Sequence, residues 1–337
     1  MQARRVQPQL IFNGHPVTVY LQDYLSNFNY TDNASGETDS IDITLNDADV
    51  GANSKWINGW LPQKNDKIKA SIAVTDWKGT GDNRSLKCGT FILDDLSFSG
   101  YPIACKIGAV AVPANSAFRE TERTQTWEDV TIKEIAKRIS TRAGIGLYFD
   151  AKAAWKIKSL EQSKKTDCSF LTDLCDKYGL SMKVYNEKIV IFDREAYKKK
   201  PQACAVSPTD FESWNWKTTL AGTYTGGVIT YTDPKTEKDV TFKVGKGPRI
   251  LSINEKVESA ADAERTLRAA INKANHGSTT LTVTLCGEVH FVAGQCISVK
   301  NLGKLSGKYY IDTVTHNCDT GSGYKITLDM SLIEKTV

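Results

Sequence analysis

The sequence lacks the features that mark membrane, secreted and nucleic-acid-binding proteins. Its longest apolar run, from Ile107 to Val112, is far shorter than the roughly 20 residues of a membrane-spanning helix. Arg4 and Arg5 are followed by no continuous apolar stretch, so no secretory signal is expected. The 43 Lys and Arg against 39 Asp and Glu leave a net charge of +4, too little over 337 residues to predict binding to nucleic acid or an anionic membrane. We therefore expect a soluble protein made in a bacterial cytoplasm.

The sequence is also poor in the residues that build catalytic and metal sites. Its four histidines are scattered, and none lies at ligand spacing from a second one: His15, His276, His290 and His316. For His316, which ends a predicted strand, a packing or hydrogen-bonding role is favoured. Eight cysteines include no pair at CxxC spacing, and we expect reduced, mostly buried thiols. The prediction is a protein with no catalytic residues, no metal and no cofactor.

What the sequence does contain is material for real hydrophobic cores. Hydrophobic residues make up 40% of the chain, charged residues 24%, and only nine residues are proline. The local patterns predict an α+β protein that is mostly β, in three parts. Residues 1–115 form a first β module, 116–200 an α+β insert, and 201–337 a second β module with a connecting helix at 260–275. In the first part, alternating apolar and polar residues predict four strands: 16–21, 40–45, 67–74 and 90–93.

The insert has helical spacing and clear helix ends. Apolar residues from Val130 to Ile139 predict a helix that Asp129 or Thr131 caps and Gly144 terminates. A second helix over 169–178, with Gly179 after it, precedes a predicted hairpin with Asn186 and Glu187 at its turn. In the third part, a hairpin over 227–231 and 240–244 precedes the 260–275 helix, which Ser259 caps with Asp262 in a capping-box pattern.

An internal repeat links the two β modules. The segment 89–99 aligns without gaps with 307–317: both read Gly, any residue, aromatic, two apolar residues, Asp, any residue, apolar, hydroxyl. The segments 99–103 and 322–326 follow as a second match, and strands 67–70 and 296–299 lie upstream of the two copies. Generic hairpin chemistry explains part of this similarity, but the conserved order of strands favours a duplication that gives two small barrels or sandwiches.

Two similar modules in one chain have a geometric use. Three chains in a cyclic trimer present six such modules around one axis, so a threefold assembly forms a quasi-sixfold ring. A ring of this kind can join a sixfold partner to a threefold one.

The C-terminal and central segments also carry a family resemblance. The residues that carry it are the segments 294–299, 305–316, 323–328 and 169–180, the last of which ends in Tyr178-Gly179-Leu180. Over about residues 125–330 the sequence resembles the baseplate hub proteins of contractile phage tails, called late control protein D, and their relatives in phage-like bacteriocins and type VI secretion spikes. The resemblance implies a structural homotrimer in the baseplate of a phage tail or tail-like particle. It would be seated between a hexameric tail tube protein and a trimeric spike protein, with a tape-measure protein and other baseplate proteins as further candidate partners.

Four tryptophans are the candidate interface residues. Trp214 and Trp216 fall on one face of a predicted strand, and Trp56 and Trp60 lie close together in the first module. Large aromatic side chains on a β module mark either its core or the centre of an interface. We predict that they help to hold the trimer, with burial in the core as the alternative.

A second function class stays open, that of a tail protein that binds cell-wall glycan or degrades peptidoglycan. Trp127 and Trp155 in the insert could stack on sugars or anchor a core. The adjacent acidic pairs, Glu128-Asp129 and Asp94-Asp95, are poor candidates for a lytic pair because neighbours on a strand face opposite ways.

Overall fold

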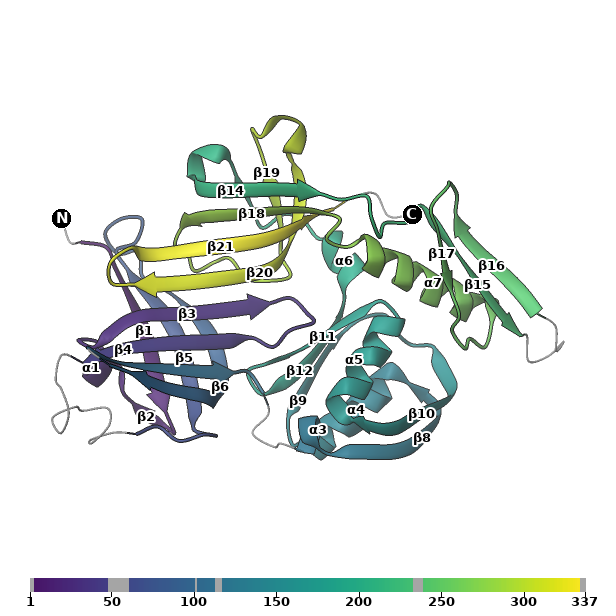
Figure 1. Ribbon diagram of the computed structural model, residues 1–337, viewed down its shortest axis with the longest axis horizontal. Helices are drawn as coiled ribbons and strands as arrows, with labels where there is room; N and C mark the ends of the chain where they lie inside the picture. Colours follow the sequence, from purple (N-terminus) through teal and green to yellow (C-terminus); the bar gives the residue numbers. More distant parts are fainter. Residues whose placement is uncertain (1–2, 48–60, 101, 113–116, 233–238, 334–337) are drawn as a thin grey trace.

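The computed structural model describes residues 3–47, 61–100, 102–112, 117–232 and 239–333. Strands dominate it, and the largest sheet runs in the order β14-β18-β21-β20-β3-β4-β7-β6-β5-β1-β2 (Figure 1). Its strands are β1 (Arg5–Phe12), β2 (His15–Pro16), β3 (Leu25–Asn33), β4 (Ser40–Asp47), β5 (Lys67–Thr75), β6 (Arg84–Ser99), β7 (Ile103–Val110), β13 (Cys204–Val206), β14 (Phe211–Thr218), β18 (Thr279–Cys286), β19 (Cys296–Val299), β20 (Gly307–Asp319) and β21 (Gly323–Leu332). The α+β, mostly β fold class predicted from the sequence is confirmed.

The remaining elements form smaller sheets and their helical covers. The other strands are β8 (Glu122–Thr131), β9 (Gly146–Asp150), β10 (Lys156–Thr166), β11 (Leu180–Tyr185), β12 (Lys188–Asp193), β15 (Gly226–Thr232), β16 (Asp239–Gly245) and β17 (Ile250–Ile253). The helices are α1 (Thr18–Leu21), α3 (Ala117–Glu120), α4 (Ile132–Ala143), α5 (Asp167–Lys177), α6 (Arg194–Lys198) and α7 (Ala260–Asn275), with short 3-10 turns at Pro208–Asp210 and Gly303–Leu305. None of the helices in the described ranges is both long enough and apolar enough to cross a membrane.

The two halves of the large sheet repeat one unit. The first unit has the order β3-β4-β7-β6-β5, and the second has β14-β18-β21-β20-β19. Strand β5 pairs with β6 so that Ile68 faces Phe91, and β19 pairs with β20 so that Ile297 faces Tyr309. These pairs are the ones that the sequence repeat aligns, so the register confirms that part of the alignment.

A matching irregularity strengthens the equivalence of the two units. The pairing of β6 with β7 shifts register between Leu93 and Asp95, and that of β20 with β21 shifts between Ile311 and Thr313. In the repeat alignment these are the same positions, so each copy has a β-bulge at its aligned aspartate. Bulges re-aim the strand that follows, and a shared bulge is a feature of a common design.

One detail of the sequence alignment is wrong. Phe98 pairs with Cys105 in the first unit, and the aligned His316 pairs with Ile326 in the second. Cys105, rather than Ile103, is therefore the counterpart of Ile326. The alignment matched Gly-Tyr at 100–101 with Gly-Tyr at 323–324, but β20 continues past the position equivalent to Ser99, so the second hairpin is longer and its turn comes later. Tyr101 itself lies outside the described residues.

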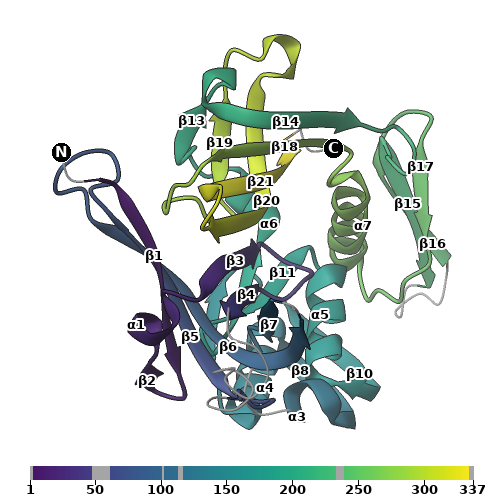
Figure 2. The same ribbon diagram turned by 60° about the vertical axis from the view of Figure 1, so that its left-hand side comes forward.

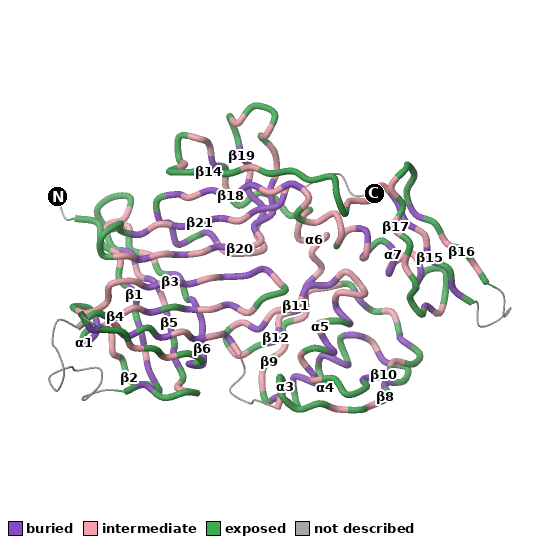
Figure 3. The backbone as a smooth tube through the Cα atoms, in the orientation of Figure 1, coloured by how far each residue is buried: buried purple, intermediate pink, exposed green. Residues whose placement is uncertain are grey.

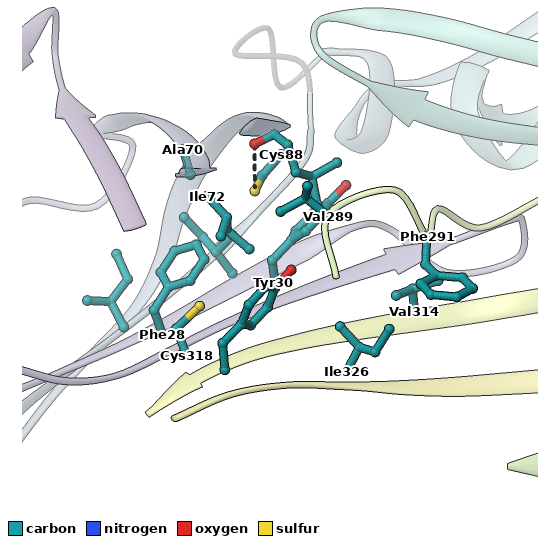
Figure 4. Close-up of a cluster of buried hydrophobic side chains, with 14 of the residues drawn as sticks. Phe28, Tyr30, Ala70, Ile72, Cys88, Val289, Phe291, Val314, Cys318 and Ile326 are labelled. Carbon is teal, nitrogen blue, oxygen red and sulfur yellow. Dashed lines mark hydrogen bonds between the residues drawn. The ribbon is translucent and has the colours of Figure 1, made fainter. Parts of the chain in front are cut away.

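The two units share one sheet and one core. Strand β3 pairs antiparallel with β20, which joins the units edge to edge. Side chains from both contribute to a single buried cluster; Figure 4 shows Phe28 and Tyr30 of β3 beside Cys318 and Ile326 of the second unit. In strands such as β5 and β7 the alternation of apolar and polar residues places the apolar side chains on this inward face.

The insert packs as a separate cluster beside the first unit, at the lower right of Figure 1. Helix α4 starts at Thr131, whose hydroxyl accepts from the Glu134 backbone N–H while the Glu134 carboxylate accepts from the Thr131 N–H, a full capping box. It ends at Gly144 in the left-handed conformation, as predicted. The hairpin turn at Asn186 and Glu187 is confirmed, both residues having positive φ. The long antiparallel pair β8 and β10 was not predicted.

Strands β15, β16 and β17 form an arm that α7 covers, with its own small core (Figure 1). The predicted helix at 260–275 and the hairpin 227–231 with 240–244 are confirmed. Ser259 caps α7 by accepting from the Asp262 N–H, but the Asp262 carboxylate accepts from Glu258 rather than from Ser259, so the predicted box is not closed.

One other prediction from the sequence fails locally. Of the strand expected over 16–21, only Pro16 is extended; Val17 is the N-cap of the single helical turn α1, and the Thr18 hydroxyl hydrogen-bonds to the Leu10 backbone where the chain turns. The eight cysteines are free and five of them are buried, in agreement with the prediction, whereas Cys286 is exposed.

Candidate assembly surface

The described residues hold no group of three metal-ligating side chains, and two of the histidines lie beside single carboxylates. His276 Nε2 lies 2.7 Å from Asp312 Oδ1, at the bulge of β20. His290 Nδ1 lies 3.3 Å from Glu288. Burial opposes ionisation of Glu288, but hydrogen bonds from Lys78, Arg84 and His290 outweigh it and lower the pKa of this carboxyl to about 2. Each of these two histidines thus has a single carboxylate neighbour, and neither belongs to a group of described ligands that could hold a metal ion.

His316 has the packing and hydrogen-bonding role that the sequence predicts. Its ring is fully buried between Tyr30, at a centroid distance of 5.8 Å, and Tyr324, at 6.1 Å. Nδ1 lies 2.8 Å from the Tyr324 hydroxyl, and Nε2 lies 3.2 Å from the Phe291 carbonyl oxygen. Burial lowers the pKa of His316 to about 4, so its imidazole is neutral at pH 7.

The structure describes two of the four candidate interface tryptophans, Trp214 and Trp216, and these two differ in burial. Trp214 and Trp216 lie on β14, the outermost strand of the large sheet, and Figure 3 shows this strand largely exposed. Trp216 packs against the main core, whereas the Trp214 side chain is 49% exposed. Trp56 and Trp60 lie outside the described residues.

The repeat explains why the two indoles face the core side of the sheet. Trp214 pairs with Val283 and Trp216 with Leu281 on β18, as Phe28 pairs with Ile43 and Tyr30 with Ile41 on β4. Because β18 and β4 are equivalent strands, β14 is the counterpart of β3, and Trp214 and Trp216 stand where the first unit has Phe28 and Tyr30.

Equivalent positions differ sharply in exposure. Phe28 and Tyr30 are 0% and 1% exposed because β20 pairs with the other edge of β3 and covers them. Among the described residues, no strand pairs with the other edge of β14. Trp214 is thus a large aromatic side chain at a position that is sealed in the first unit and open in the second.

A second open edge lies at the far end of the same run of strands. In β20, one edge is shared by β19 along residues 307–310 and by β3 along residues 313–319. In β6, the equivalent edge is paired with β5 up to Ile92, and residues 95–99 have no strand partner there within the described chain. Edge strands with free backbone groups are templates for pairing with another chain.

A buried ion cluster fixes the insert to the first unit, and sequence reasoning missed it. Lys183 Nζ of β11 lies 2.6 Å from Asp32 Oδ1, 2.9 Å from Asp39 Oδ2 and 2.6 Å from the Asn33 carbonyl oxygen. Burial raises the pKa of Asp39 to about 7, against the lowering effect of Lys183. Asp32 lies two residues after Tyr30, so it faces the core side of β3, where the alternation otherwise places apolar residues. A carboxylate at such a position needs a buried partner, and this was the one sign of the cluster that the sequence contained.

The insert tryptophans proposed to stack on sugars are engaged within the protein. Trp127 is 1% exposed and stacks on Phe170 at 6.1 Å between ring centroids. Trp155 packs against Tyr178 on one side, and the Arg265 guanidinium lies 4.7 Å from its ring centroid. Trp127 is therefore a core residue, and this removes one of the two side chains on which the glycan-binding alternative depends.

Comparison with known proteins agrees with the predicted resemblance. No protein-family model matches the chain. It is 30% identical to the probable baseplate hub protein of Escherichia phage P2 over 230 residues, which are 64% of this chain but only 54% of that protein, so the match spans about half the length of this relative. It is 24% identical to the probable baseplate hub protein of Escherichia phage 186 over 96% of this chain and 92% of that protein.

Solved structures agree in fold. The tail protein from Neisseria meningitidis MC58 has a TM-score of 0.74 at 11% identity over 97% of this chain and 96% of that one. The 43 kDa tail protein of prophage MuSo2 from Shewanella oneidensis has a TM-score of 0.73 at 12% identity over 96% and 98%. The E. coli c3393 protein, a component of the type VI secretion system, has a TM-score of 0.57 at 11% identity over 99% and 78%. The resemblance to phage baseplate hub proteins that the sequence predicts is confirmed.

Proposed function

We propose that this relative of the phage baseplate hub proteins is itself a structural hub of a contractile phage tail or tail-like particle. Three copies would form a ring of quasi-sixfold symmetry that joins a hexameric tail tube to a trimeric spike. The single observation that supports the proposal most is the repeat of one β unit within the chain, with the same strand order, register and bulge.

The repeat gives a threefold assembly sixfold spacing. Within one chain the two units are already joined edge to edge by β3 and β20. If the same junction forms between chains, a cyclic trimer closes with six equivalent units around its axis. The six β units of such a ring can each contact one of six tube subunits, while its three chains can each contact one of three spike subunits.

The proposed division of labour follows the three parts of the sequence. Residues 1–115 and 201–337 would supply the ring, with the 260–275 helix connecting the arm to the second unit. Residues 116–200 would be the insert, which the Lys183 cluster holds against the first unit. Trp214 and Trp216, and with them Trp56 and Trp60, are the proposed trimer contacts. In this role the protein performs no catalysis and resides in the baseplate of the assembled particle. Its proposed partners are the tail tube protein and the spike protein, with the tape-measure protein as a further candidate.

Multi-angle light scattering of the purified chain, alone and mixed with the spike protein of its particle, tests the proposal. Three chains of 37.2 kDa make a particle of about 112 kDa. A chain that stays monomeric at high concentration with the spike present would contradict the ring. Peptidoglycan pull-down and zymography complete the test, since binding or clearing by the purified protein would favour a glycan-directed role instead.

A further inference from the structure

We infer that strand β14 of one copy pairs with the open edge of β6, residues 95–99, in a second copy, in the register with which β3 pairs with β20 inside the chain. The inference rests on the proposed ring and identifies the two surfaces that close it. The occupant of each edge is therefore a second copy of this chain.

The internal junction between β3 and β20 is the template. Tyr30 lies opposite His316, and their rings stack with an interplanar angle of 16°. On the other face Asn29 lies opposite Asn317, and the two side-chain amides are hydrogen-bonded. The junction thus has a buried aromatic pair on the core side and a polar pair on the outer side.

Replacing each strand of the template by its counterpart predicts the contacts between copies. Strand β14 takes the place of β3, and β6 takes the place of β20. On the core side, Trp216 then lies opposite Phe98, an aromatic pair like that of Tyr30 and His316. Trp214 lies opposite Gly100, so the neighbouring copy covers the indole that is 49% exposed in the single chain.

The outer side of the predicted junction is polar, as in the template. Asn215 falls opposite Ser99, and Lys217 falls opposite Ser97 and diagonal to Asp95. A cross-strand diagonal is within reach of a lysine side chain, so Lys217 and Asp95 can pair across the two copies. All of these residues except the half-buried Trp216 and Phe98 are exposed in the single chain.

The two edges cannot satisfy each other within one molecule. They lie at opposite ends of the strand run β14-β18-β21-β20-β3-β4-β7-β6, at the top and the bottom of the view in Figure 1. Each copy offers one β14 edge and one β6 edge, which makes the contact head to tail. Head-to-tail contacts form a ring when the rotation closes.

Disulfide trapping tests this register directly. The variant Ser99→Cys with Asn215→Cys is made in a Cys286→Ser background, which removes the exposed native thiol. Directly opposed residues on antiparallel strands have Cα atoms about 4.5–5.5 Å apart, within the range that a disulfide spans. Mild oxidation should give covalent dimers and trimers on a non-reducing gel.

The matched control pairs Asp95→Cys with Asn215→Cys in the same background. Both thiols then lie on the same outer face, but they are four residues out of register, roughly 13 Å along the strands. We expect at least tenfold less cross-linked product from the control than from the in-register pair.

The two proposals fail in different ways. Absence of the in-register cross-link in a preparation that light scattering shows to be trimeric would overturn the β14–β6 junction and leave the ring standing. Equal cross-linking of both cysteine pairs would overturn the register. A preparation that remains monomeric with the spike present and does not cross-link would overturn the ring, and the junction with it.

Discussion

The imidazole of His316 lies at a position where its aligned partner in the first unit is Phe98, and this difference defines a test at the scale of one residue. Because the pKa of His316 is lowered to about 4, the unfolded chain binds a proton near pH 6.5 that the folded chain does not take up until about pH 4. The contribution of His316 to stability is therefore complete above pH 6.5 and falls as the pH drops toward 4. The change is on the order of 3 kcal/mol.

His316→Phe should remove this pH dependence. At pH 7 the variant loses about 1–3 kcal/mol in the free energy of unfolding, because the Tyr324 hydroxyl and the Phe291 carbonyl oxygen lose a buried partner. At pH 4.5 the difference from the parent chain should shrink, since the parent has lost most of its pH-dependent stability. Urea unfolding at both pH values measures this. Tyr324→Phe is the control, because it removes the hydroxyl partner but keeps the imidazole; a pH-independent cost for His316→Phe would refute the argument.

At the scale of elements, the contact between β11 and β3 depends on a lysine that balances two buried carboxylates. Lys183→Met would leave Asp32 and Asp39 without their cation, although these side chains are 7% and 0% exposed. Removing one partner of a buried ion cluster costs about 3–5 kcal/mol. The cost should be smaller at pH 5, where the Asp39 carboxyl, whose pKa burial raises to about 7, can take up a proton in the folded state.

The same junction supplies the matched control. Lys67 of β5 and Glu187 at the tip of the β11–β12 hairpin also join the first unit to the insert, at 2.5 Å, but both side chains are nearly half exposed. Lys67→Met should cost about 0–1 kcal/mol, the range of exposed pairs. Thermal unfolding of the two variants compares them, and similar losses for both would show that the buried cluster is not what fixes the insert.

The elements also show what the sequence could and could not reveal. Helix α7 and the α4 cap are set by contacts three or four residues apart, so spacing alone predicts them. The repeat placed strands 67–70 and 296–299 at equivalent positions because the same pattern occurs twice, and the structure pairs them with β6 and β20 in equivalent registers. The pairing of β3 with β20 joins residues almost 300 positions apart, and no local pattern encodes it. The open edges at Trp214 and at 95–99 can be recognised only by comparison with that pairing. The sequence therefore identified Trp214 and Trp216 as candidate interface residues but not the strand edge that they would contact.

At the scale of the whole molecule, one chain contains one paired junction between its two units, β3 with β20, and, within the described residues, two open strand edges, those of β14 and of β6 at residues 95–99. The unit β14-β18-β21-β20 meets the unit β3-β4-β7-β6 at a sealed edge, and each outer edge is the complement of the other. Figure 2 shows β14 running along the outside of the second unit toward the arm, with its far edge free of other described strands. The single chain therefore leaves the Trp214 side chain 49% exposed, and the proposed junction between copies would cover it.

A single charge at the open position should therefore prevent assembly without unfolding the chain. In Trp214→Lys the new ammonium group points to the core side of the sheet, where a neighbouring copy would bury it without a partner, at a cost of several kcal/mol. In the isolated chain the same position is 49% exposed, so circular dichroism and the melting temperature should change little. Light scattering should show loss of the particle of about 112 kDa that three chains form. Ile250→Lys, at a position on β17 with a similar exposure of 44%, should keep the parent mass; a trimeric Trp214→Lys variant would exclude this edge from the interface.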